Sequence, residues 1–313
     1  MDWLKSVAKS LGRWFGFGFY GIVLVFLGIY ISNLDWDKLT SISISWTWLL
    51  VATVFGLGAR FLFARIWIFF LHNLGATIKG EKTYELYEVY AKSWLGRYIP
   101  GSVAWVLGKV YFASKLGISK TKLAVSSFLE AILQIITIML TASLLLVVDP
   151  RSYQLAGNSI WLILGFAILG LVAVMPAVLA KYVGMIYEFV KKAELDPSAI
   201  PNGKTLVKAV GLFVISSLVS GLAFYFVALA VAPEVGVREL LFILAASNLA
   251  SAVSMVAIFA PAGVGVREAI QIAALLFVMS PEQALAATLL MRLMSIGWDG
   301  MFLGLAKALR AAR

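Results

Sequence analysis

Charged side chains within long apolar segments are the residues of this sequence most able to do chemistry. A charge at the centre of a membrane costs roughly 2.5–3.5 kcal/mol on insertion scales, so such a residue by default marks a function or a partner. Basic members outnumber acidic ones, which predicts a polar cavity of net positive charge. The set comprises Arg60, Arg65, Lys109, Arg267 and Arg292 as candidate substrate-binding residues, and Glu130, Glu268 and Asp299 as counter-charges or proton relays.

The spacing of these residues allows two interpretations. Glu130 and Gln134 lie four residues apart and therefore share one face of a helix. A shared polar face favours a cavity where two halves of the protein meet. The alternative is a set of buried ion pairs that only fix helix packing, for instance Glu130 with Arg60 and Glu268 with Arg292.

Two helix-breaking motifs interrupt the apolar pattern, RYIPGSV at 97–103 and FAPAGVGVRE at 259–268. Proline removes a backbone donor and disfavours helix in the residue before it. The helix that begins after each break offers free N–H groups and a dipole that favour an anion, and arginine presents a planar fork of donors that matches phosphate oxygens. These features predict a phosphate-bearing substrate, and the apolar surroundings predict that the rest of it is lipid. The expected hairpin tips and hinges are Pro100, Gly101, Pro261, Gly263 and Gly265.

The elements that must position these residues are membrane-spanning helices. Of the 313 residues, 62% are hydrophobic and only 13% are charged, whereas a soluble domain carries about 25% charged residues. Apolar runs of about 20 residues are long enough to cross the hydrocarbon core. We therefore expect a single all-α polytopic domain over 1–313 with about six full spans. Five are the runs Trp14–Asn33, Thr47–Leu71, Leu123–Val148, Ile160–Val183 and Leu206–Val231, and the sixth follows Ser280.

Two further segments, 81–117 and 242–278, are expected to form re-entrant helical hairpins. Each has a helix-prone stretch, a break with proline and small residues, and a second stretch, and broken backbone at membrane depth is tolerated where protein buries it or where it lines a cavity. This topology places most of the 26 Lys and Arg residues and both termini in the cytoplasm. A rival topology makes Leu240–Ala260 a full span, which leaves the basic C-terminus outside.

The order of features occurs twice. A shift of 161 residues (261 − 100) lays Pro100 on Pro261 and Ser119 on Ser280. The two copies, about 14–148 and 160–309, have opposite orientations in the expected topology. Inverted repeats of this kind are common in transporters that alternate access to a midplane site. The alternative is a duplication in a scaffold or a membrane-embedded enzyme.

Several kinds of site are excluded or disfavoured. Cysteine is absent and His72 is the only histidine, so disulfides, Cys-based metal sites and thiol chemistry are excluded, and we expect no cofactor or metal. The net charge of +10 does not indicate nucleic-acid binding, because the sequence contains no soluble domain that could carry a recognition element. The basic N-terminal segment is expected to be a retained first span, because no cleavage site follows it.

The motifs also resemble a known family. PAGVGVREA at 261–269, with Arg292 in the following span, resembles the C-terminal signature of the lysylphosphatidylglycerol synthase transmembrane/flippase-like family, and YIPGSVAWVLGKVY at 98–111 with Glu130 resembles its N-terminal signature. Ala262 replaces a glycine of that pattern, and Lys109 stands where arginine is usual. The matched positions of the second motif are Pro261, Gly263, Gly265, Arg267 and Glu268.

The resemblance implies a bacterial or archaeal plasma-membrane (inner-membrane) protein that moves a lipid between leaflets. Family members that transfer amino acids add a large soluble C-terminal domain. This chain ends at Arg313, directly after the last span, so we expect the membrane domain only.

The main hypothesis is a flippase for an anionic phospholipid or polyprenyl-phosphate carrier, without enzymatic activity. No GxxxxGK[ST] motif is present, so movement would be downhill or ion-coupled. One alternative is a membrane-embedded transferase or hydrolase that acts on a lipid phosphate, for which only the three buried acids could serve as base or nucleophile. Another is a non-transporting partner of a lipid-modifying enzyme. A homo-oligomer is also possible.

Overall fold

The computed structural model describes residues 28–29, 32, 35–76, 80–98, 104–151, 160–175, 177–178, 181–182, 202–257 and 263–312. Helices form all the regular secondary structure of this part of the chain, as the composition predicts. The principal helices are α2 (Trp36–Ser41), α3 (Trp46–Asn73), α4 (Gly80–Trp94), α5 (Ala104–Ser114), α6 (Lys120–Val148), α8 (Ile160–Ala173), α10 (Gly203–Val231), α11 (Leu240–Val256), α12 (Val266–Leu275) and α13 (Pro281–Ala311). Short 3-10 turns, η1 (Leu95–Tyr98) and η4 (Val237–Glu239), extend α4 and precede α11.

Five segments of the described chain are long and apolar enough to cross a membrane: α3, α6, α10, α13 and Val237–Val256. The protein is therefore a multi-pass membrane protein. Four of these segments correspond to predicted full spans. The fifth overlaps most of Leu240–Ala260, the segment that the rival topology treats as a span, so length and composition do not separate the two topologies. Of the remaining predicted spans, Trp14–Asn33 lies almost wholly outside the described residues, and Ile160–Val183 is described mainly as α8, a 14-residue helix.

Local sequence fixes where the long helices begin. Ser280 caps α13, because its hydroxyl accepts a hydrogen bond from the Gln283 amide while the Gln283 side chain accepts one from the Ser280 amide. Pro281 follows at the first helical position, where its missing N–H costs nothing. Asn202 caps α10 in the same manner, by accepting from the Thr205 amide at 2.9 Å.

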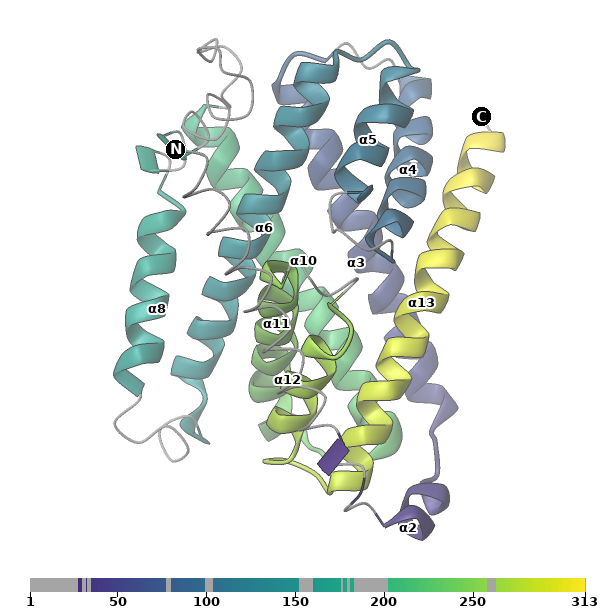
Figure 1. Cartoon of the computed structure of the whole chain (residues 1–313), viewed down its shortest axis with the longest axis vertical. Coiled ribbons are helices and arrows are strands. Elements are labelled where there is room, and N and C mark those ends of the chain that lie inside the picture. The colour runs from purple at the N-terminus through teal and green to yellow at the C-terminus, as the bar shows by residue number, and fades with distance from the viewer. Residues whose placement is uncertain are drawn as a thin grey trace, which may run out of the picture.

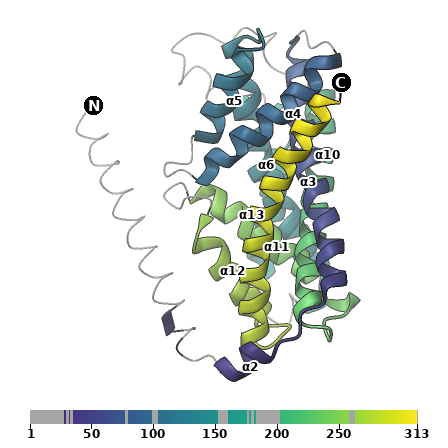
Figure 2. The ribbon, with the colours of Figure 1, turned by 90° about the vertical axis from the view of Figure 1, so that its right-hand side faces the viewer.

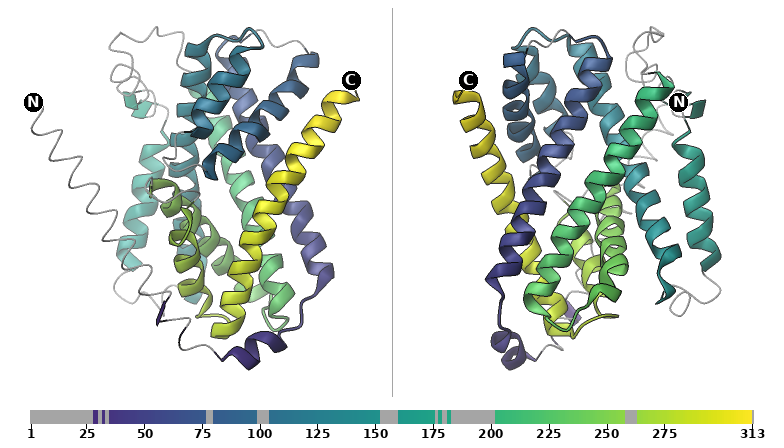
Figure 3. Two further views of the ribbon diagram at one scale, coloured as in Figure 1. Left: turned by 45° about the vertical axis from the view of Figure 1, so that its right-hand side comes forward. Right: turned by 180° about the vertical axis from the view of Figure 1, so that it is seen from behind.

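We call α4–α5 and α11–α12, the helices on either side of 99–103 and of 258–262, the two broken pairs; they occupy opposite halves of the molecule. In Figures 1 and 2, α4 and α5 lie together in the upper half, and α11 and α12 lie together in the lower half. The helices α3, α6, α10 and α13 run between the two ends, and Figure 3 shows α3 and α10 crossing against each other. The ends of α4, α5, α11 and α12 that flank these two segments thus come near the middle of the bundle.

The packing follows one pattern in both halves of the chain. The contacts of α4 with α13, of α5 with α6 and of α3 with α6 are matched by contacts of α11 with α6, of α12 with α13 and of α10 with α13. In each match, every helix is replaced by its counterpart in the other half of the chain: α3 by α10, α4 by α11, α5 by α12 and α6 by α13, and the reverse. These are the helices that the sequence assigns to two repeats.

A glycine on α3, Gly56, packs directly against a tryptophan on α13, Trp298. A β-carbon added at Gly56 would lie 2.4 Å from the ring of Trp298, so only glycine fits there. The Trp298 indole in turn donates a hydrogen bond to the Thr53 hydroxyl at 3.1 Å. Small residues that let helices approach closely are typical of helix packing in membranes.

Candidate functional site

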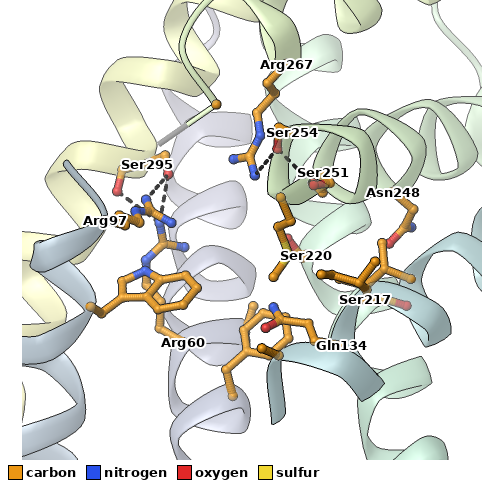
Figure 4. Close-up of a pocket in the computed structure, with 18 of the residues that line it drawn as sticks. Arg60, Arg97, Gln134, Ser217, Ser220, Asn248, Ser251, Ser254, Arg267 and Ser295 are labelled. Atoms are coloured by element: carbon orange, nitrogen blue, oxygen red, sulfur yellow. Dashed lines mark hydrogen bonds between the residues drawn. The ribbon is translucent and has the colours of Figure 1, made fainter. Parts of the chain in front are cut away.

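A cavity of about 260 Å³ lies in the middle of the bundle, where the two broken helix pairs meet (Figure 4). Its wall comes from α3, α4, η1, α5, α6, α10, α11, α12 and α13. Three guanidinium groups face it, from Arg60 on α3, Arg97 on η1 and Arg267 on α12. The rest of the wall is apolar, aromatic or uncharged and polar, including Phe63, Trp94, Trp105, Gln134, Ile135, Ser217, Ser220, Asn248, Ser251, Ser254 and Ser295.

One carboxylate holds two of these arginines. Asp299 is 1% exposed, and it accepts from Arg60 Nε at 2.7 Å and from an Arg97 terminal nitrogen at 2.6 Å. The Tyr98 hydroxyl donates to the same carboxylate at 2.6 Å, and Ser295 accepts from Arg60 at 2.9 Å. A buried charge is tolerated when it is paired and hydrogen-bonded. Asp299 thus fixes both guanidinium groups but offsets only one of their charges.

The Arg97 guanidinium does not use all its hydrogen-bond donors within the described residues. Its guanidinium lies 4.8 Å from the Trp94 ring centroid, in a cation–π arrangement. Its Nε is buried and makes no hydrogen bond with the described residues. A buried donor without a partner costs about 1–3 kcal/mol.

Arg267 stands in the first turn of α12, directly after two glycines with positive φ, Gly263 (69°) and Gly265 (81°). This left-handed backbone turns the chain into α12, and Glu268 caps the new helix by accepting from the Gly265 amide at 2.7 Å. The only hydrogen bond of the Arg267 side chain within the described residues is a long one, 3.4 Å, to the Ser254 hydroxyl. Its Nε is buried and unpaired there. No carboxylate of the described residues pairs with this guanidinium.

A second charged cluster is sealed away from the cavity. Lys109 on α5 and Glu130 on α6 form an ion pair in which both residues are 0% exposed. The Tyr90 hydroxyl on α4 donates to Glu130 at 2.8 Å. The Lys109 ammonium also lies over the rings of Tyr90, Trp105 and Trp67, at 4.2, 4.5 and 5.3 Å from their centroids. This cluster fastens α4 and α5 to α6.

The family model of the lysylphosphatidylglycerol synthase TM region matches residues 13–304. The chain belongs to this family. A search of the curated proteins finds no match. The matched range contains every residue of the cavity wall, and it confirms the resemblance seen in the two Pro/Gly motifs.

The structure corrects one predicted pairing of this family member and agrees with another. Arg292 pairs with Glu268 at 3.2 Å, as the packing interpretation predicts. The predicted pairing of Arg60 with Glu130 is wrong, because Arg60 reaches Asp299 on α13 while Glu130 is taken by Lys109 on the neighbouring α5.

The predicted substrate-binding residues do not all come together. Arg60 and Arg267 line the cavity, whereas Lys109 lies behind its wall because Glu130 and three aromatic rings enclose it. Arg65 lies on α3 but is exposed away from the cavity. Arg292 is half-buried beside Glu268 and is not part of the wall. Of the expected hinge residues, Gly263 and Gly265 have the glycine-specific backbone, and three lie outside the described residues, namely Pro100, Gly101 and Pro261.

Sequence reasoning missed Arg97. In the expected topology it counts as one of the cytoplasmic basic residues, because it follows the polar stretch YELYEVYAKSWLG. The structure places it in η1, at the inner end of the first broken pair. A signal in the sequence could have placed Arg97, because it lies three residues before Pro100, at the predicted tip of the first hairpin. Arg267 likewise lies close to Pro261, at the predicted tip of the second. None of the described residues forms a group of His, Cys, Asp or Glu side chains that could hold a metal ion.

Proposed function

We propose that this protein moves a lipid with an anionic, phosphate-bearing headgroup between the leaflets of the membrane. The observation that carries the proposal is one cavity faced by three guanidinium groups, those of Arg60, Arg97 and Arg267, to which the described residues supply a single paired carboxylate, that of Asp299. Arginine and phosphate form short, charge-assisted and often bidentate hydrogen bonds. A phosphate there would bridge Arg97, which belongs to the first broken pair, and Arg267, which belongs to the second.

The architecture supports movement of the bound headgroup across the membrane. We infer that 14–148 and 160–309 are inverted repeats, with α4–α5 and α11–α12 as re-entrant hairpins from opposite faces. The cavity lies where the two pairs meet, the arrangement in which alternating access exposes a midplane site to either side. The positive φ angles of Gly263 and Gly265 support a hinge at the second break.

The charge distribution supports an orientation for this topology. The helix ends at the top of Figure 1 include the C-terminal ends of α3, α5 and α13 and the N-terminal ends of α4, α6 and α10. They carry many more basic residues than the opposite end, and the positive-inside rule would place them in the cytoplasm. They include Lys115, Lys120, Lys122, Lys204, Lys307 and Arg310.

Membership of the family supports a lipid as the substrate. The family is named for the transmembrane region of a lysylphosphatidylglycerol synthase, an enzyme of lipid modification. For this chain we propose transport without a covalent step, because the acids of the central region are engaged with basic side chains. Asp299, Glu130 and Glu268 each form an ion pair.

The test is lipid movement in liposomes that contain the purified protein. A phosphatidylglycerol analogue with a fluorescent acyl chain is placed in both leaflets, and a membrane-impermeant reductant reports the rate at which inner-leaflet lipid reaches the outside. Wild-type protein should accelerate this exchange. Arg267→Gln should slow it by about tenfold or more, because it removes charged hydrogen bonds worth about 1.5–3 kcal/mol each.

Arg65→Gln is the matched control, since it removes the same charge from an exposed position on α3. It should behave as wild type. Equal rates for wild-type and empty liposomes, or for Arg267→Gln and wild type, would refute the proposal. Release of a free headgroup from lipid by the protein in detergent would indicate the enzymatic alternative instead.

A further inference from the structure

Ion pairs between the described helices are of two kinds. Some join consecutive helices within one half of the chain, such as Lys109–Glu130 between α5 and α6 and Glu268–Arg292 between α12 and α13. Others cross between the helix group α3–α6 and the helix group α10–α13. The crossing pairs lie at three levels of the bundle, namely its two ends and its middle.

The first crossing pair lies at the end of the bundle that carries the C-terminus of α13, which we call the basic end. Arg310, in the last turn of α13, donates to the Glu88 carboxylate on α4 at 2.8 Å. The Glu88 side chain is only 8% exposed, and it also pairs with Lys92 of its own helix at 2.6 Å. Figure 2 shows α4 beside the upper part of α13. Arg310–Glu88 is the basic-end ion pair.

The second crossing pair lies at the opposite end of the bundle. Arg151, which follows α6, pairs with Glu239 in η4, directly before α11, at 3.3 Å. The Arg151 guanidinium also donates to the Arg238 carbonyl and pairs with Asp149, which is 1% exposed, at 3.4 Å. In Figure 1 the C-terminal end of α6 lies at the bottom, with α11 in the same half of the molecule. Arg151–Glu239 is the opposite-end ion pair.

The two ion pairs occupy equivalent places in the packing pattern. The counterpart of α4 is α11, and the counterpart of α13 is α6. Each ion pair therefore joins the first helix of a broken pair, or the turn before it, to the C-terminal end of the last span of the other group. At the level of the cavity, Asp299 on α13 holds Arg60 on α3 and Arg97 on η1. The two groups are thus tied together at both ends and at the centre.

We propose that the basic-end and opposite-end ion pairs are the gates of alternating access. Opening the cavity toward one end breaks the ion pair at that end and keeps the other. This inference rests on the proposed function and specifies how the movement is controlled. When one repeat rocks against the other, the repeats separate at one end at a time. Pairs within a group move as a unit, and the contacts of Asp299 lie at the pivot and persist in both states.

The surroundings of the two ion pairs suit contacts that form and break. The Arg310 side chain is 52% exposed and that of Arg151 is 24% exposed, and exposed pairs are individually weak. Breaking them also strands no buried charge. Glu88 keeps Lys92 as a partner, and Arg151 keeps Asp149.

Spin labels can measure the opening of each end. The chain contains no cysteine, so labelled pairs can be introduced without removing native ones. Ser119→Cys with Ala308→Cys joins the two groups across the basic end, and Val148→Cys with Val237→Cys joins them across the opposite end. All four positions are exposed. The distance distribution of each labelled pair, in purified full-length protein in liposomes, gives the fraction of molecules in which that end is open.

Each test variant removes only the crossing contact. Arg310→Gln leaves Glu88 paired with Lys92. Glu239→Gln leaves an acceptor for the Gly236 amide. Arg310→Gln should raise the open fraction at the basic end by about two- to fivefold, without raising it at the opposite end. Glu239→Gln should do the reverse, and the double variant should restore the wild-type ratio of the two open fractions.

Two control variants neutralise exposed charges beside the ion pairs. Lys307→Gln changes a residue of α13 three positions before Arg310, and Arg238→Gln changes the neighbour of Glu239. Both controls should keep the open fractions of wild type, because the side chains they remove are not the ones that cross between the groups.

Three outcomes overturn the inference. The first is an unchanged distance distribution in both Arg310→Gln and Glu239→Gln. The second is an equal change in the controls, which would indicate an effect of net charge alone. The third is the opening of both ends by a single variant. Lipid exchange in the same liposomes tests the proposed function separately: if the variants open the expected ends while wild-type protein moves no lipid, the gates stand and the proposed function fails.

Discussion

Replacing Lys109 with methionine should destabilise the protein strongly, although Lys109 lies outside the cavity. The substitution keeps a side chain of similar length but leaves the Glu130 carboxylate fully buried without its partner. Breaking a buried ion pair in this way costs about 3–5 kcal/mol. For a chain of 313 residues, with an unfolding entropy of about 2.1 cal/mol/K per residue, each kcal/mol corresponds to about 1.5 °C in Tm. The expected decrease in Tm is therefore about 5–8 °C.

The second member of the pair should behave differently. Glu130→Gln keeps an acceptor for the Tyr90 hydroxyl, and the ammonium left behind still lies over three aromatic rings. Cation–π contacts contribute about 2 kcal/mol or more where they are desolvated, so this variant should lose less stability than Lys109→Met. The double variant Lys109→Met/Glu130→Gln contains no buried charge at this position, and its Tm should recover to within a few degrees of wild type.

Thermal unfolding in detergent, followed by intrinsic tryptophan fluorescence, measures all four proteins of this double-mutant cycle. The difference between the double variant and the sum of the single ones gives the coupling energy of the pair, which we expect to be about 3 kcal/mol. Additive effects would contradict a direct ion pair. So would a Lys109→Met variant with the Tm of wild type.

Three further predictions concern helix packing and the cavity. Gly56→Ala should lower Tm because its β-carbon would meet the Trp298 ring at 2.4 Å, whereas Gly58→Ala, whose nearest contact would be 3.9 Å, should be neutral or slightly stabilising by the same unfolding measurement. Asp299→Asn should lower Tm by leaving two guanidinium groups unneutralised, and added phosphatidylglycerol should restore Tm more than it raises that of wild type. Gly265→Ala should cost about 1–2 kcal/mol, because φ is 81° there, and should slow lipid exchange in liposomes.

Much of the helical framework could be predicted because it depends on properties local to the sequence. Runs of about 20 apolar residues are sufficient to identify the long helices, and the Ser-Pro pair at 280–281 fixes the start of α13. The Glu268–Arg292 pair was predictable because α12 and α13 are consecutive and joined by a short connection. Helices that follow one another after a short connection must lie near each other, so contacts between them can be predicted from the sequence.

The partners of Arg60 and Arg97 depend instead on how distant helices rotate against each other. Asp299 lies 239 residues from Arg60 and 202 from Arg97, and no local pattern fixes which face of α13 meets α3 and η1. A hydropathy pattern also reports the mean polarity of a segment and not the depth of one side chain. Arg97 follows a polar stretch, so the pattern assigns it to the aqueous face, whereas its guanidinium is at the centre of the bundle.

Each half of the molecule has an ion pair between the second helix of its broken pair and the span that follows, and the positions of acid and base are reversed between the halves. In the first half, the base is Lys109 on the second broken helix and the acid is Glu130 on the span that follows; in the second half, the acid is Glu268 and the base is Arg292. The first pair is 0% exposed on both sides, and the second is 19% and 12% exposed. Separating a fully buried pair leaves an uncompensated buried charge and costs several kcal/mol, whereas solvent screens a pair that is partly exposed. The ion pair that fastens α5 to α6 is therefore more costly to break than the one that fastens α12 to α13.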